Sequence, residues 1–269
     1  MSPELPQSSR RAVLGSIGRR SSLSWVGVAA FVLLWSVLSN SGWVSSLLLP
    51  SPFRVLHSVA DVGTTLVLHV AATVARIAVG FLLGAVVGVA VGMGMQYSRV
   101  VFVALDGLVE TWRPVPPVAL VPFFILLFGF SELGKIFIVT LGVALVLVVT
   151  TVEAVERVPV GILRWGLSCG LSRRALFRMV IWPAAWPDMR GGARIALALA
   201  VTLVIVSEFM GATYGLGYLI STSKVTLTTP TLLLSVIVLG WLGYGFDRLI
   251  RYLFDRTCAW DIRAKGATR

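Results

Sequence analysis

The chain has 269 residues, of which 57% are hydrophobic and 13% charged, and its formal net charge is +11. Soluble domains carry about 25% charged residues, so this composition excludes an ordinary soluble fold. Because about 20 apolar residues span a hydrocarbon core of about 30 Å, the sequence predicts an all-α integral membrane protein with several spans and short loops.

Six apolar stretches follow one another along the chain and predict six transmembrane helices. The predicted spans cover 23–38, 66–95, 100–130, 135–151, 195–210 and 230–254. The polar segment 1–22 is predicted to be a flexible tail, 23–261 a transmembrane domain, and 262–269 a second short tail.

The second span contains a row of glycines and one arginine. Glycines four residues apart share one face of a helix and allow another helix to approach closely. The row consists of Gly80, Gly84, Gly88 and Gly92. Arg76 lies in the first half of the same span, where a charge is costly unless it is paired or hydrated.

Prolines interrupt the third span, and polar residues precede them. Pro114, Pro116 and Pro117 predict a broken span, since proline cannot continue a helix. Asp106, Glu110 and Arg113 are spaced by four and three residues, which places them on one helix face.

A polar connection, residues 156–187, joins the fourth and fifth spans. We expect two short helices, 160–168 and 172–180, with a turn at 169–171. Gly170 suits a left-handed turn residue, and Ser172 is a suitable N-cap for the second helix. An amphipathic surface loop without a partner is the alternative interpretation.

The basic residues predict that both termini lie in the cytoplasm. Seventeen lysines and arginines flank the spans on the side of the termini, whereas the opposite flanks hold only Arg54, Lys135 and Lys224. Cys169 and Cys258 then both lie on the cytoplasmic side, where a disulfide is not expected.

Several kinds of site are absent from the sequence. No phosphate-binding loop ending in Gly-Lys-Ser/Thr is present, and His57 and His69 have no carboxylate cluster at ligand spacing. No serine or cysteine lies in a nucleophile signature. We therefore expect no enzyme, no metal and no cofactor in this chain.

The polar connection resembles the coupling loop of permease subunits of bacterial binding-protein-dependent ABC importers. The family pattern is Glu-Ala-Ala, three residues, Gly, about nine residues, Ile, two residues and Pro, and Gly170 and Pro183 match it. Six further segments resemble the alkanesulfonate, taurine and nitrate branch: Leu-Leu-Pro-Ser-Pro at 48–52, Arg-Pro-Val-Pro-Pro at 113–117, Phe-Gly-Phe at 128–130, Ser-Glu-Phe-Met-Gly-Ala at 207–212, Gly-Leu-Gly-Tyr-Leu at 215–219 and Asp-Arg-Leu at 247–249.

The resemblance implies a permease subunit in the cytoplasmic membrane, most often a homodimer, in contact with membrane lipid. Two copies of a separate ATPase would bind ATP and Mg²⁺, and an extracytoplasmic binding protein would deliver a small anion such as an alkanesulfonate, taurine or nitrate. The loop would dock on the ATPase through Arg164, Trp165, Gly166, Gly170, Ser172, Arg173, Arg174 and Pro183.

The sequence departs from the family pattern at one place. Arg164 stands where the family has Glu, Trp165 replaces the first Ala, and Gly166 replaces the second. Docking would then depend on Arg173, Arg174 and the Gly170 turn, or on an adapted ATPase, or the coupling would be weaker.

The polar residues inside the spans have two interpretations. In one, Arg76 and Arg113 line an anion path and Glu208 is a gate or a structural anchor. In the other, these residues form ion pairs between helices. A secondary transporter driven by an ion gradient is the alternative function, and it would require inverted repeats and acidic residues at the midplane.

Overall fold

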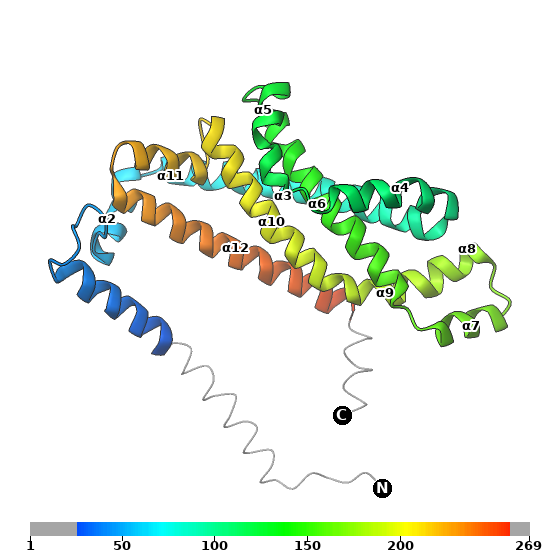
Figure 1. Cartoon of the computed structure of the whole chain (residues 1–269). Helices are drawn as coiled ribbons and strands as arrows, with labels where there is room; N and C mark the ends of the chain where they lie inside the picture. Colours follow the sequence, from blue (N-terminus) through cyan, green and yellow to red (C-terminus); the bar gives the residue numbers. More distant parts are fainter. Residues whose placement is uncertain (1–25, 259–269) are drawn as a thin grey trace, which may run out of the picture. The chain divides into compact units, whose positions relative to one another are not determined.

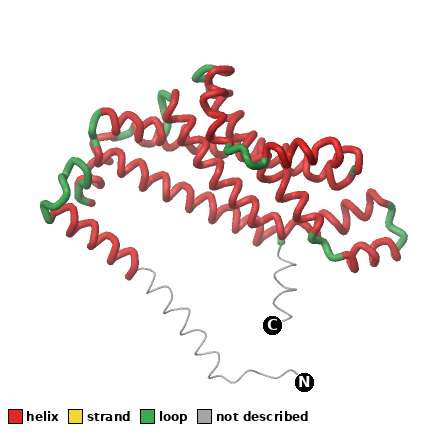
Figure 2. Tube along the Cα trace, viewed as in Figure 1, coloured by secondary structure: helices red, strands yellow, loops and turns green. Residues whose placement is uncertain are grey.

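The computed structural model describes residues 26–258, and every regular element in that range is helical (Figures 1 and 2). The predicted tails 1–22 and 262–269 lie outside the described residues. The long helices are α3 (Thr65–Tyr97), α6 (Glu132–Glu156), α10 (Met189–Gly211) and α12 (Thr229–Thr257). The shorter elements are a helix at Val26–Asn40, α2 (Pro52–Val62), α4 (Arg99–Trp112), a 3₁₀ turn (Pro117–Leu120), α5 (Val121–Phe128), α7 (Val160–Ser168), α8 (Arg173–Leu176), a π turn (Phe177–Ile181), α9 (Trp182–Ala185), a 3₁₀ turn (Trp186–Asp188) and α11 (Leu216–Val225).

Four described helices are long and apolar enough to cross a membrane: α3, α6, α12 and the continuous helical stretch Arg173–Gly211 that contains α10. They coincide with the second, fourth, fifth and sixth predicted spans. The third predicted span is broken, as the prolines predict, because α4 and Pro117–Phe128 are bent by 86°. The first predicted span overlaps the helix Val26–Asn40, which is shorter than a span, and its beginning lies outside the described residues.

The chain divides into two compact units, the first of which comprises the described residues 26–63 and 223–234. Within it, Trp35 Nε1 donates a hydrogen bond to the carbonyl of Pro50 at 3.1 Å. Ser51 caps α2, since its Oγ accepts from the amide of Arg54 at 3.4 Å, and Pro52 occupies the first helical position. The Leu-Leu-Pro-Ser-Pro segment is thus the start signal of α2.

The second unit, which comprises the described residues 64–222 and 235–258, is built on the contact between α3 and α6. A Cβ added at Gly84 would lie 2.7 Å from the carbonyl oxygen of Thr140, and one at Gly88 would lie 2.6 Å from that of Ala144. Real Cβ atoms do not come that close, so only glycine permits this approach of the two backbones. The close helix contact predicted from the glycine row is confirmed.

The helices α3 and α6 run parallel. Arg76, in the first half of α3, pairs with Glu132 at the start of α6, and Gln96 donates to Glu156 at 3.3 Å near the C-terminal ends of both helices. Residues 98–131 must therefore return along the whole length of the pair before α6 can begin. The return is completed by α5, because Phe128 packs against the start of α6.

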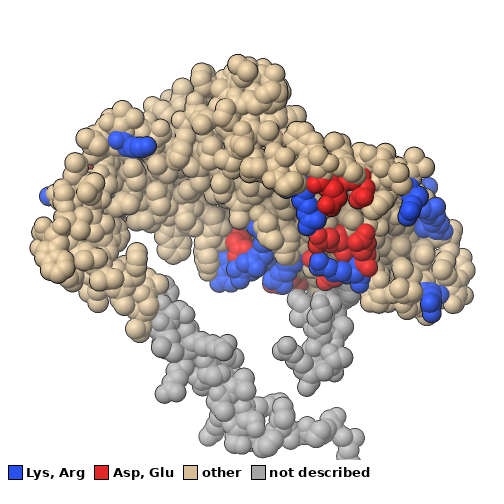
Figure 3. All heavy atoms as spheres, in the orientation of Figure 1, with Lys and Arg blue, Asp and Glu red and all other residues tan. Residues whose placement is uncertain are grey.

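The third long helix, α10, packs on α6 and α3 and closes the core of this unit. The core residues are Ile77, Val139, Val143, Leu147, Ala196, Ala200, Leu203 and Val204. On the face shown in Figure 3, most charged side chains gather where α6 and α12 end and where α7 and α8 lie, and the rest is largely uncharged. This segregation is typical of a protein with one end in water and its middle in lipid.

Candidate functional site

The connection between α6 and α10 forms a helical hairpin of α7 and α8, which we call the 160–188 hairpin. The expected helix 160–168 is α7, with the same bounds. Gly170 has φ of +72°, and Ser172 Oγ accepts from the amide of Ala175 at 3.4 Å. The left-handed turn and the N-cap predicted from these two residues are both confirmed.

The second arm of the hairpin is not one regular helix. It begins as α8 and continues through the π turn Phe177–Ile181. It then joins α10, so that the helical stretch is continuous from Arg173 to Gly211. Pro183 follows the π turn, and proline lacks the amide hydrogen that a regular α-helix would use. The wider turn precedes Pro183, and the second proline, Pro187, lies in the 3₁₀ turn Trp186–Asp188, so the helical stretch passes both prolines without ending.

Gly166 lies inside the hairpin. A Cβ at this position would lie 2.5 Å from Leu176 Cδ1 and 3.5 Å from Val180 Cγ2, so Gly166 lets α7 pack against the second arm. Gly166 is buried between the two arms of the hairpin, and its predicted role in docking on the ATPase stays a prediction.

The outward face of the hairpin is basic and aromatic. Residues 157–187 include five arginines and no aspartate or glutamate. Arg164 and Arg174 are exposed, and Trp165 is 66% exposed. An exposed tryptophan beside arginines, in a segment without acidic residues, is typical of a surface that contacts another protein.

Arg173 points to another helix. Its Nη2 donates to the carbonyl of Tyr97 at 2.6 Å, and its guanidinium carbon lies 5.4 Å from the centroid of the Tyr97 ring. The hairpin is thereby attached to the C-terminal end of α3.

Arg76 and Glu208 form a closed ion cluster with Glu132. The Nε and Nη2 atoms of Arg76 each donate to Glu132 at 2.7 Å, and Nη1 donates to Glu208 at 2.6 Å and to the carbonyl of Tyr214 at 2.7 Å. The side chains of Arg76 and Glu208 are 7% and 0% exposed, whereas Glu132 is 57% exposed. The geometry is that of an ion pair between helices, the second interpretation drawn from the sequence.

The same cluster holds the first turn of α11. The amides of Gly215, Leu216 and Gly217 donate to His69 Nδ1 at 3.1 Å, Thr73 Oγ1 at 2.8 Å and Glu208 Oε2 at 2.8 Å, respectively. The N-terminal amides of a helix have no partner within the helix. Here α3 and α10 supply these acceptors, and the negative charge of Glu208 faces the positive end of the helix dipole.

Arg113 lines a cavity of about 330 Å³ beside α4, α6 and α10. Its contacts with Glu110 and Glu153 are long, 3.5 and 3.4 Å, and its side chain is 53% exposed. Trp112 and Thr150 line the same cavity. Two arginines are predicted to line an anion path. Every side-chain nitrogen of Arg76 already donates a hydrogen bond, so Arg113 is the one with more capacity to bind an anion. Asp106, on the same face of α4, forms no ion pair in the part of the chain that the structure describes.

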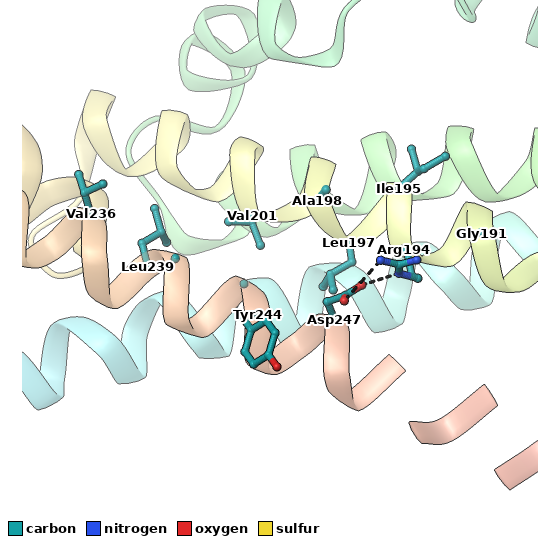
Figure 4. A pocket seen from close by; sticks show the side chains of 12 residues that line it. Gly191, Arg194, Ile195, Leu197, Ala198, Val201, Val236, Leu239, Tyr244 and Asp247 are labelled. Carbon is teal, nitrogen blue, oxygen red and sulfur yellow. Dashed lines mark hydrogen bonds and ion pairs between the residues drawn. The ribbon is translucent and has the colours of Figure 1, made fainter. Parts of the chain in front are cut away.

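An apolar groove of about 930 Å³ lies between α10 and α12 (Figure 4). Arg194 and Asp247 face each other at one end, with Arg194 Nε donating to Asp247 Oδ1 at 2.5 Å. Asp247 also pairs with Arg251. None of the residues predicted for coupling or for the anion path lines this groove.

Sequence reasoning missed Glu132 in the ion cluster and, beside the cluster, the two acceptors His69 and Thr73. His69, Thr73 and Arg76 are spaced by four and three residues, which is a detectable signal for one helix face. Glu132 gives no comparable signal, because it precedes the apolar residues of α6 and its position in the sequence is that of a loop residue before the helix.

A sequence model of the family described as "Binding-protein-dependent transport system inner membrane component" matches residues 80–257. The taurine transport system permease protein of Escherichia coli strain K12 is 28% identical over 251 residues, 91% of each chain. A protein named as an aliphatic sulfonates transport permease from the same organism is 33% identical and covers 81% of this chain and 84% of its own. The nitrate import permease protein of a Synechocystis strain is 28% identical, with 85% and 86% covered.

Among solved structures, a chain of the MetNI methionine ABC transporter in an inward-facing conformation is similar in fold. The TM-score is 0.56 at 23% sequence identity, and the alignment covers 71% of this chain and 97% of that chain.

Proposed function

The chain belongs to the binding-protein-dependent transport system inner membrane components, and from that membership we propose that it is the permease subunit of an ATP-driven importer of small anions. It is a multi-pass protein of the cytoplasmic membrane. Separate ATPase subunits bind ATP and Mg²⁺ and carry out hydrolysis, and an extracytoplasmic binding protein delivers the substrate. A second permease copy completes the membrane part, which is surrounded by lipid. The relatives named for taurine, sulfonates and nitrate support an anion as cargo.

We place six spans in the membrane and both termini in the cytoplasm. The parallel course of α3 and α6 supports this topology, because the return between them needs one crossing by α4 and α5. With 33 residues, α3 is roughly 50 Å long, well beyond the hydrocarbon core of about 30 Å. The hairpin at its C-terminal end therefore lies in water.

The observation that carries the function is the rigid, exposed 160–188 hairpin at the end of these spans. A displacement of the hairpin by the ATPase can shift the helix packing only if the ATPase binds the two packings with different affinity. The Gly170 turn, the Ser172 cap and the packing of Gly166 support a hairpin that moves as one piece.

The function is tested by purifying the tagged chain from its native membranes in mild detergent and identifying what accompanies it. We expect an ATPase subunit, and a binding protein that takes up small anions. Vesicles that contain the purified complex should import the anion with ATP after the ion gradient is collapsed. Uptake that follows the gradient and ignores ATP would instead support the secondary transporter.

Arg164 offers a test of the docking surface. Changing Arg164 to Glu should reduce the amount of ATPase that co-purifies by about tenfold, because it reverses a charge on a basic face whose complement is an acidic partner surface. Arg164→Lys keeps the charge and should retain the ATPase. Tighter retention by the Glu variant would mean that the partner surface is not acidic.

Arg113 offers a test of the anion path. A hydrogen bond to a charged group contributes about 1.5–3 kcal/mol, so Arg113→Gln should raise the KM for anion uptake by about ten- to a hundredfold. ATP hydrolysis by the complex should continue. Arg99→Gln, at the exposed opposite end of α4, is the control, and equal KM values for the two variants would remove Arg113 from the path.

A further inference from the structure

The C-terminal end of α3 is capped by a side chain from the hairpin. The last four carbonyls of a helix have no donor within the helix, and a positive charge near them is favourable. The last turn of α3 has no basic residue of its own. Arg173 supplies both the donor and the charge, through its 2.6 Å hydrogen bond to the carbonyl of Tyr97.

The position of Arg173 in its own helix does not explain its presence. It is the first residue of α8, and a cation at the N-terminal end of a helix faces the positive end of the dipole. At the C-terminal end of α3 the same cation faces the negative end. The electrostatic benefit of Arg173 therefore lies in its contact with α3.

The ring of Tyr97 is held from two sides by the hairpin. The guanidinium of Arg173 lies over the ring at 5.4 Å, and Phe177, one turn further along, meets it edge-on with ring centroids 5.4 Å apart at 75°. Both geometries are favourable for an aromatic ring. The hairpin thus holds the end of α3 with a hydrogen bond and two ring contacts.

The helix α3 connects this contact to the rest of the second unit. The glycine row fixes α3 to α6, and His69, Thr73 and Arg76 near its other end hold the first turn of α11. A displacement of the end of α3 would therefore reach α6 and α11 together.

We infer that Arg173 and Tyr97 form the contact through which a displacement of the 160–188 hairpin is passed to α3. Arg173 is then a positioning residue inside the permease and does not belong to the docking surface for the ATPase. This inference rests on the proposed function and names the residues that carry its coupling step.

The test uses the full complex with its ATPase subunits and binding protein in proteoliposomes, and it measures anion uptake per ATP hydrolysed. Arg173→Gln and Tyr97→Leu should co-purify with as much ATPase as the unaltered chain, while uptake per ATP falls at least tenfold. Tyr97→Phe keeps the ring and the carbonyl and should behave as the unaltered chain. Arg178→Gln, an exposed arginine one turn beyond Arg174, is the charge control.

Two results would overturn the inference. Loss of the ATPase from the Arg173→Gln complex would place Arg173 in the docking surface, and an unchanged uptake per ATP would show that the contact carries no coupling. If the unaltered complex imports no anion with ATP, the proposed function itself is contradicted, and the inference falls with it.

A cross-link provides a second measurement that keeps both residues. Met93 and Arg178 line one groove beside Tyr97, so cysteines at these two positions can be joined by a cleavable thiol cross-linker after Cys169 and Cys258 are changed to Ser. Because the hairpin and the end of α3 move together in this proposal, the linked protein should transport as fast as the unlinked one. Loss of transport that cleavage of the linker restores would overturn the proposal.

Discussion

Replacing Arg76 by Gln should lower the thermal unfolding midpoint of the purified protein more than any other single change in the ion cluster. The carboxylate of Glu208, which has no exposed surface, would lose its counter-charge. Breaking a buried ion pair in this way costs about 3–5 kcal/mol, because a charge remains buried without a partner. The measurement is thermal unfolding in detergent, followed by the loss of monodisperse protein.

Two further variants separate charge from packing in this cluster. Glu132→Gln removes a carboxylate that is 57% exposed and pairs with Arg76 and Lys135, and it should cost less than Arg76→Gln, because no carboxylate without exposed surface is left unpaired. The double change of Arg76 and Glu208 to Gln removes both charges and should recover much of the stability. If the double variant is as unstable as Arg76→Gln alone, the buried charge is not the cause.

Replacing Gly170 by Val should abolish transport while the protein stays in the membrane. Gly170 has φ of +72°, a conformation that a β-branched residue rarely adopts, so the turn between α7 and α8 would have to change. The turn at Gly170 is exposed and has no neighbour within 4 Å of an added Cβ, so the spans should remain folded. Uptake in vesicles and the amount of protein in the membrane fraction are the two measurements.

A matched glycine and a tolerated residue make this prediction specific. Gly161 on α7 has open space around its Cα and no positive φ, so Gly161→Val should leave uptake within about twofold. Gly170→Asn should keep part of the activity, because asparagine tolerates the left-handed region. Normal uptake by Gly170→Val would remove the hairpin from the coupling step.

The sequence predicted helix contacts best where the spacing of residues along one helix defines its contact face. Glycines 80 to 92 predicted a close helix contact, and the contact exists. The identity of the partner, α6, could not be predicted, because a glycine row offers no side chain that would select one neighbour. The break in the third span followed from its prolines, whereas the 86° bend depends on how Pro117–Phe128 packs along α6.

The candidate site was predicted only where its features depend on neighbouring residues in the sequence. The turn at Gly170 and the cap at Ser172 are local, so they can be read from neighbouring residues. The contact of Arg173 with Tyr97 joins residues 76 positions apart, and no short pattern connects them. The family pattern places Gly166 in the docking segment, whereas its packing against Leu176 within the hairpin could not be predicted from the pattern.

The ion cluster also has a consequence for the order in which the protein assembles. Chains are synthesised from the N-terminus, and Arg76 is made first; Glu132 follows 56 residues later and Glu208 132 residues later. When α6 is inserted, the guanidinium gains its first carboxylate, and α10 brings the second. Only then does the amide of Gly217 have its acceptor, Glu208, beside His69 and Thr73 of α3, which accept from the amides of Gly215 and Leu216. The first turn of α11 is therefore complete only when α3 and α10 have met, so delayed insertion of α10 would leave the amide of Gly217 without its acceptor.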